Sequence, residues 1–124
     1  MSASRPPAPP GLRIRLVLAP GFMIGPGKAD LLEGIHETGS IAAAGRRMKM
    51  SYKRAWLLVE ALNAGFREPL VTATRGGRSR GGAVLTDLGQ EVLAAYRRME
   101  AQAAQAAAAE IAAIRAAAGQ SAPE

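Results

Sequence analysis

Apolar residues recur at spacings of three and four over residues 39–63, which form two short helical patterns separated by a brief turn. The first pattern has an inner face made of Ile41, Ala44 and Met48. The second has an inner face made of Ala55, Leu58, Val59 and Leu62. The turn is too short for the helices to separate, so we expect them to cross and share a core. The pattern therefore predicts a helix-turn-helix.

Polar residues mark the starts of both helices. Ser40 and Ser51 are expected N-caps, because serine hydroxyls accept hydrogen bonds from the N–H groups of a first helical turn. In the second helix Lys53 points away from the apolar face, and Tyr52 and Arg54 lie on its flanks. Such a basic first turn favours DNA binding, and a solvated face on a simple packing unit is the alternative for this stretch alone.

Alternation, glycine and proline predict the remaining elements. These are a strand over residues 12–19, a turn over 20–27, a helix over 28–38, paired strands over 70–74 and Ala83–Leu85, and a helix of about 30 residues from the N-cap Thr86 to near Gly119. Residues 1–11 hold four of the eight prolines and are expected to be a disordered leader, with a disordered tail over residues 120–124.

The segment between the paired strands combines four glycines with three arginines, RGGRSRGG over residues 75–82. Arginine forks suit phosphates and narrow minor grooves, so this loop is expected to be a DNA-binding wing, with a flexible linker as the alternative. The net charge of +6 is concentrated nearby: residues 46–80 hold nine basic and two acidic residues, and the rest of the chain is nearly neutral. This distribution favours a polyanionic partner.

Other classes of function find little support in the sequence. It has no cysteine and one histidine, His36, which no carboxylate pair accompanies, so we expect neither a metal site nor a catalytic site. Residues 21–28 lack the spacing of a phosphate-binding loop. No apolar run reaches the length of a membrane span, and no secretory signal is visible. We therefore expect a cytoplasmic protein that is not an enzyme and uses no cofactor.

The last predicted helix is rich in alanine and carries a thin apolar stripe over residues 99–119. Close helix pairing uses such stripes, so this extension is expected to join two copies of the chain, with a helix frayed in solvent as the alternative. The expected dimerisation residues are Tyr96, Met99, Ala103, Ala106, Ala107, Ile111 and Ile114.

Three segments together resemble a known family: GSIAAAGRRMKMSYKRAW, the Leu62-Asn63 pair, and TRGGRSRGGAVLTDLGQ. They are similar to the DNA-binding domain of ModE-type molybdate-responsive transcriptional regulators, which are related to LysR-type regulators. The likeness covers roughly residues 12–99. It implies a mainly α (α+β) fold: a winged helix-turn-helix domain over residues 12–98, with a β-hairpin wing and a long C-terminal dimerisation helix.

The resemblance also implies a homodimer on a palindromic operator in double-stranded DNA, controlling genes for molybdenum uptake or use. The expected DNA-binding residues are Ser40, Arg46, Arg47, Lys49, Ser51, Tyr52, Lys53, Arg54, Arg75, Arg78, Ser79 and Arg80. Trp56 is expected to brace the core edge, with a sugar-backbone contact as the alternative. Nothing in the sequence resembles the family's molybdate-binding domains, which leaves three alternatives: a stand-alone DNA-binding form, a separate molybdate-sensing protein as partner, or a molybdate site formed by arginines and helix N-termini. The alternative function is a winged-helix adaptor that binds protein and does not read DNA.

Overall fold

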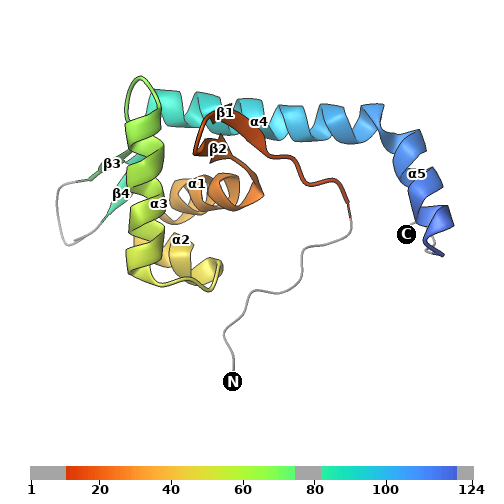
Figure 1. Ribbon diagram of the computed structural model, residues 1–124. Helices are drawn as coiled ribbons and strands as arrows, with labels where there is room; N and C mark the ends of the chain where they lie inside the picture. Colours follow the sequence, from red (N-terminus) through yellow and green to blue (C-terminus); the bar gives the residue numbers. More distant parts are fainter. Residues whose placement is uncertain (1–10, 75–81, 120–124) are drawn as a thin grey trace.

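The structure, a computed structural model, describes residues 11–74 and 82–119 and has the predicted mainly helical winged helix-turn-helix architecture (Figure 1). Two short hairpins accompany the helices. In chain order the elements are β1 (Leu16–Ala19), β2 (Phe22–Ile24), α1 (Pro26–Thr38), α2 (Ile41–Arg47), α3 (Tyr52–Gly65), β3 (Val71–Ala73), β4 (Ala83–Leu85), α4 (Asp87–Ala106) and α5 (Ala108–Ala117).

The N-terminal hairpin corrects the sequence prediction. Residues 20–27 were expected to form only a turn, but β2 lies within them and pairs antiparallel with β1, Val17 opposite Met23. Gly21 makes this tight reversal because its φ of 75° is unfavourable for residues with a side chain. Helix α1 starts two residues earlier than predicted, because Pro26 fits the first helical turn, where no N–H donor is needed.

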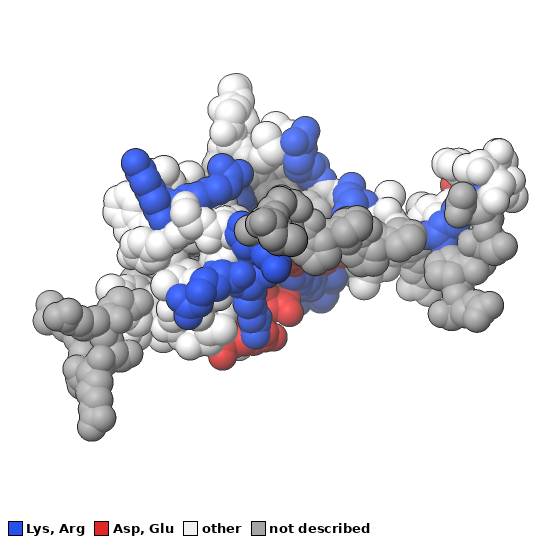
Figure 2. Space-filling model, turned by 90° about the horizontal axis from the view of Figure 1, so that it is seen from below, with Lys and Arg blue, Asp and Glu red and all other residues white. Residues whose placement is uncertain are grey.

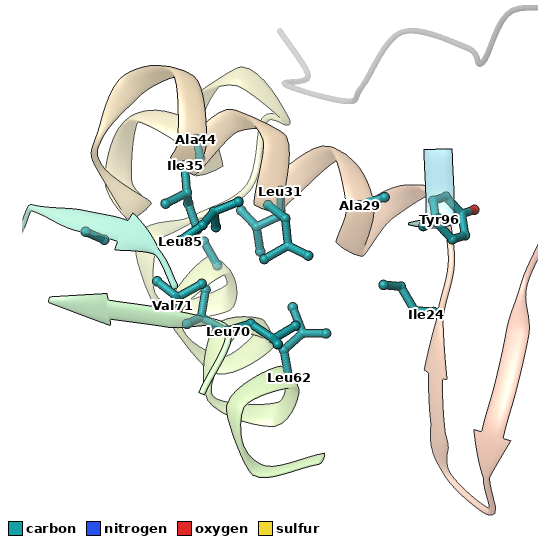
Figure 3. Packing of buried hydrophobic residues seen from close by; sticks show 14 of the residues in the cluster. Ile24, Ala29, Leu31, Ile35, Ala44, Leu62, Leu70, Val71, Leu85 and Tyr96 are labelled. Carbon is teal, nitrogen blue, oxygen red and sulfur yellow. The ribbon is translucent and has the colours of Figure 1, made fainter. Parts of the chain in front are cut away.

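The core lies between α1, α3 and the β3–β4 hairpin. Its largest fully buried side chains are Leu31, Leu32, Ile35, Leu62 and Leu70, and Figure 3 shows that those labelled converge from the three elements. Helices α1 and α2 cross closely, since a Cβ on Gly34 would lie 2.9 Å from the Ala44 Cβ. This contact fixes the angle at which the helix-turn-helix leaves α1.

An ion-pair cluster holds α4 across α1. The Arg97 Nη2 atom lies 2.8 Å from Asp30 Oδ1 and 2.7 Å from Glu33 Oε1, and its Nη1 lies 3.0 Å from Glu100 Oε1. Burial lowers the pKa of Arg97, but hydrogen bonds to the three carboxylates raise it by more, so the pKa lies above its usual value. The guanidinium therefore stays charged and joins the two helices.

The C-terminal part of the chain differs from the prediction in two respects. The expected continuous helix is interrupted at Ala107, where φ is −97° and ψ is 10°, and Figure 1 shows α5 turning away from the axis of α4. Most residues near the break are exposed, so helix propensity alone would have to keep the two helices straight. No helix in the described ranges is long and apolar enough to cross a membrane.

Tyr96 is the second difference. It was expected on a dimer surface, but its side chain is only 3% exposed and its hydroxyl donates a 2.6 Å hydrogen bond to the Ile14 carbonyl oxygen. Its ring faces the body of the protomer because α4 lies across α1 there. Tyr96 therefore belongs to the core of one chain.

Candidate nucleic-acid interface

The start of α3 presents polar side chains on a rigid base. The Ser51 hydroxyl accepts a 3.1 Å hydrogen bond from the Arg54 N–H, which confirms the predicted cap. Ala55, Val59 and Leu62 are buried on one side of α3, while Tyr52, Lys53 and Arg54 are exposed. No acidic residue occupies this first turn, so its electrostatic field favours anions.

The turn between α2 and α3 is tightly fixed. Lys49 has a φ of 58°, a left-handed conformation that few residues with a side chain adopt. The Met50 N–H donates a 3.0 Å hydrogen bond back to the Gly45 carbonyl. A Cβ on Gly45 would lie 3.1 Å from the Ala55 Cβ, so α2 and α3 are close at this point. The backbone thus orients α3 and holds Lys49 beside its start.

Basic side chains surround this start. Figure 2 views the end of the molecule where α2 leads into α3, and Lys and Arg side chains spread over this face while acidic ones form a smaller group. The exposed basic residues of the two helices and their turn are Arg46, Arg47, Lys49, Lys53 and Arg54. Arg47 also pairs with Glu37, at 2.6 Å between Nη1 and Oε1. The charge of Arg47 is therefore partly neutralised, and the sequence analysis did not predict this pair.

The base of the β3–β4 hairpin is attached to the N-terminus of α2. Gly82 forms a β-bridge with Ser40, and the Ala83 N–H donates a 2.9 Å hydrogen bond to the Gly39 carbonyl. The Ser40 hydroxyl also caps α2 by accepting a hydrogen bond from the Ala43 N–H. The predicted wing contacts Arg75, Arg78, Ser79 and Arg80 lie outside the described residues, and their role stays a prediction.

A second attachment joins the hairpin to the other end of α3 through Asn63. The Asn63 Oδ1 atom accepts hydrogen bonds from the Leu70 N–H (2.8 Å) and the Val71 N–H (3.1 Å). Its Nδ2 donates a 3.0 Å bond to the Val71 carbonyl. Sequence reasoning assigned Asn63 no structural role, although an amide at a helix end followed by a strand was a usable signal. Asn63 thus sets the position of the wing strands relative to α3.

Two large apolar side chains on α3 are exposed. Trp56 is 41% exposed and lies outside the core cluster, so it does not brace the core as expected. Leu57 is 50% exposed and lies one helical turn after Lys53. It lines an open hollow of about 250 Å³ with Ser51, Lys53, Arg54 and Leu58.

The residues expected to pair two chains have mixed environments. Met99, Ala103, Ala107 and Ile111 are half-buried, Ala106 is exposed, and Ile114 is 68% exposed. Met99 packs against the core of its own protomer. Their use in a dimer stays a prediction. Among the described residues no group of histidine and carboxylate side chains could hold a metal ion.

Comparison with known proteins finds relatives of this chain whose names concern molybdenum or DNA binding. The chain is 47% identical over 81 residues to the molybdenum-pterin-binding protein MopB of Rhodobacter capsulatus, covering 65% of this chain and 30% of that protein. It is 44% identical over 70 residues to the molybdenum transport protein ModE of Azotobacter vinelandii, covering 56% and 26% of the two chains. It is 37% identical over 71 residues to the DNA-binding transcriptional dual regulator ModE of Escherichia coli K12, covering 57% and 27%.

The chain thus spans about 30% of the length of the curated relatives that it matches. By their names, these relatives are a binding protein, a transport protein and a transcriptional regulator, and none is named as an enzyme. No protein-family model matches the chain. Its fold is similar to a crystal structure of the CbnR DNA-binding domain in complex with DNA, with a TM-score of 0.55 and 27% identity over 71% of this chain and 95% of that one. The chain is therefore homologous to the amino-terminal DNA-binding region of ModE regulators and has the winged helix-turn-helix fold of LysR-type DNA-binding domains.

Proposed function

We propose that this protein is a sequence-specific DNA-binding transcriptional regulator. The observation that carries the proposal is the capped start of α3, where Tyr52, Lys53 and Arg54 project into solvent. Helices of this kind enter the major groove with their first turns, where these side chains meet base edges. The solved structure with the similar fold contains DNA, which supports the same use here.

The exposed residues divide into two groups by their position. Tyr52, Lys53 and Arg54 lie on the entering turn and read or approach bases. Arg46, Arg47 and Lys49 precede that turn and hold phosphates, as do the wing residues Arg75, Arg78, Ser79 and Arg80. The hydroxyls of Ser40 and Ser51 accept capping bonds and can still donate a proton to a phosphate oxygen.

The proposal includes a homodimer on a palindromic operator. The C-terminal helices expose alanines and Ile114, and a small core gains stability from a second copy. Two copies related by a twofold axis would place two α3 helices in successive major grooves. Sedimentation of wild type and Ile114→Lys tests this: a charge on the stripe is expected to shift the protein towards monomer, and an unchanged dimer would move the interface elsewhere.

The controlled genes are proposed to serve molybdenum uptake or use, working in the cytoplasm. Support comes from the relatives, whose names concern molybdenum transport and molybdenum-pterin binding. A footprint on the chain's own upstream DNA, with and without molybdate, tests this part. The absence of protection in both conditions would contradict it.

Binding across salt and sequence tests the division of roles. Lys53→Ala is expected to weaken binding to the preferred duplex by about 1 to 3 kcal/mol and to relax preference at one base position. Arg46→Ala is the matched control, because the same loss of charge outside the entering turn should weaken all duplexes alike and lower the salt slope by about 0.9. The same uniform loss from both variants would show that the assignment is wrong.

An adaptor that binds protein is the second candidate, favoured by the exposed apolar side chains of Leu16, Val17 and Leu18 in β1. The two functions differ in a competition assay at physiological salt. A regulator retains its preferred duplex against excess bulk DNA, whereas an adaptor with a basic face loses it. Complete displacement by bulk DNA would favour the adaptor.

A further inference from the structure

Leu57 lies on the reading side of α3, where an apolar side chain has no structural task. It follows Lys53 by four residues, so the two share one exposed stripe of the helix. The opposite side of α3 carries the buried residues Ala55, Val59 and Leu62. Half of the Leu57 surface is accessible, and Leu57 is not part of the core cluster. An exposed leucine therefore accompanies the basic side chains that are proposed to enter the groove.

The hollow beside Leu57 combines two kinds of chemistry. Ser51, Lys53 and Arg54 contribute polar and cationic groups to its lining, and Leu57 and Leu58, about one helical turn later, contribute aliphatic carbon. In the major groove only thymine presents an acceptor oxygen, O4, next to a methyl group on C5. A cation near O4 and an aliphatic side chain against the methyl group would match that edge.

We propose that Leu57 is a specificity-determining residue that packs against the C5 methyl group of a thymine in the bound operator. The inference rests on the proposed DNA-binding function and specifies which base Leu57 recognises and which methyl group it contacts. Burying a single methyl group stabilises a complex by about 0.8 kcal/mol, which corresponds to about a fourfold change in affinity for each thymine contacted.

Replacing thymine by uracil tests the contact, because uracil differs from thymine only by the missing methyl group. A preferred duplex is first selected from random DNA with the full chain, and each thymine is then replaced in turn by deoxyuridine. Affinity is followed by the fluorescence of Trp56, the single tryptophan of the chain, which is exposed on the same helix. When the thymine that contacts Leu57 is replaced, wild type is expected to bind the uracil duplex about fourfold more weakly than the thymine duplex.

Variants assign the effect to Leu57. Leu57→Ala should bind the thymine duplex about fourfold more weakly than wild type and should no longer distinguish it from the uracil duplex. Leu57→Met keeps an aliphatic surface and should retain the discrimination. Val17→Ala, which shortens an apolar side chain on β1 that is 62% exposed, is the control and should behave as wild type. Thermal melting of each variant checks that all are folded.

The outcomes separate this inference from the proposed function. If no duplex is selected over bulk DNA, the regulator and the thymine contact both fail. If a duplex is selected but no uracil substitution weakens wild-type binding, or Leu57→Ala keeps the full discrimination, only the Leu57 contact is overturned.

Discussion

Asn63 is expected to be the most consequential polar side chain in the fold. The Thr86 N–H donates a hydrogen bond to the Leu70 carbonyl, and the Thr74 N–H donates one to the Gly82 carbonyl. Backbone groups of alternate residues in a strand point in opposite directions, so the hydrogen-bonding groups of β3 that are directed at β4 belong to residues of even number. The N–H and C=O of Val71 therefore point to the opposite side, where the Asn63 amide bonds both. One side chain thus takes the place of a neighbouring strand.

Asn63→Ala removes the acceptor of two backbone N–H groups and the donor to one carbonyl. Leu70 is fully buried and Val71 nearly so, and each donor left unsatisfied costs about 1 to 3 kcal/mol. Asn63 is half-buried, so water can reach part of the gap and the lower half of this range applies. We expect a loss of about 2 to 4 kcal/mol, which is a melting temperature lower by about 10 to 20 °C.

Urea and thermal denaturation followed by circular dichroism measure this loss. Asn63→Asp keeps an acceptor oxygen but loses the amide donor, so its stability should lie between alanine and wild type. Gln102→Ala, at an exposed position in α4, is the control and should change stability by less than about 0.5 kcal/mol. If Asn63→Ala were as stable as this control, the bonds of Asn63 would not hold β3 to α3.

Three further changes test other contacts. Glu37→Gln removes the carboxylate that pairs with Arg47, so Arg47 should become free to bind a phosphate. The slope of log affinity against log salt, measured by fluorescence anisotropy between about 50 and 200 mM salt, should then steepen by about 0.9. An unchanged slope would show that the pair does not restrain Arg47. Gly89→Ala would place a Cβ 2.1 Å from the Leu70 carbonyl oxygen, so the variant should melt far below wild type, and wild-type melting would contradict this approach of backbone to backbone. Burial raises the pKa of the Tyr96 phenol above its usual value. The unfolded chain therefore loses this proton at a lower pH than the folded protein, and folding stability should fall as pH rises above about 10. Urea denaturation from about pH 8 to 11 measures this fall, and Tyr96→Phe should lack it.

The local parts of the fold were predictable from the sequence. Ser40, Ser51 and Thr86 all cap helices as expected, because a cap depends only on a side chain and on N–H groups three residues later. The buried face of α3 also follows its spacing, since the helix repeat fixes which residues share a side. Strand β4 was predicted with its observed bounds.

Contacts between distant segments could not be predicted in this way. Arg97 meets Asp30 at a separation of 67 residues, and Tyr96 meets Ile14 at a separation of 82, so periodicity contains no sign of either pair. The interruption at Ala107 lies in a run of alanines with high helix propensity, which predicted continuity.

The two anchors of the wing hairpin make the intervening loop interchangeable. Thr74 and Gly82 close the ladder with a 3.0 Å hydrogen bond, and Gly82 is bridged to Ser40. Because these hydrogen bonds join backbone atoms, we expect insertions between the two residues to leave the hairpin base and α3 in place. Under the proposed function, changes in this segment would then alter the strength of DNA binding and leave the base preference of α3 unchanged.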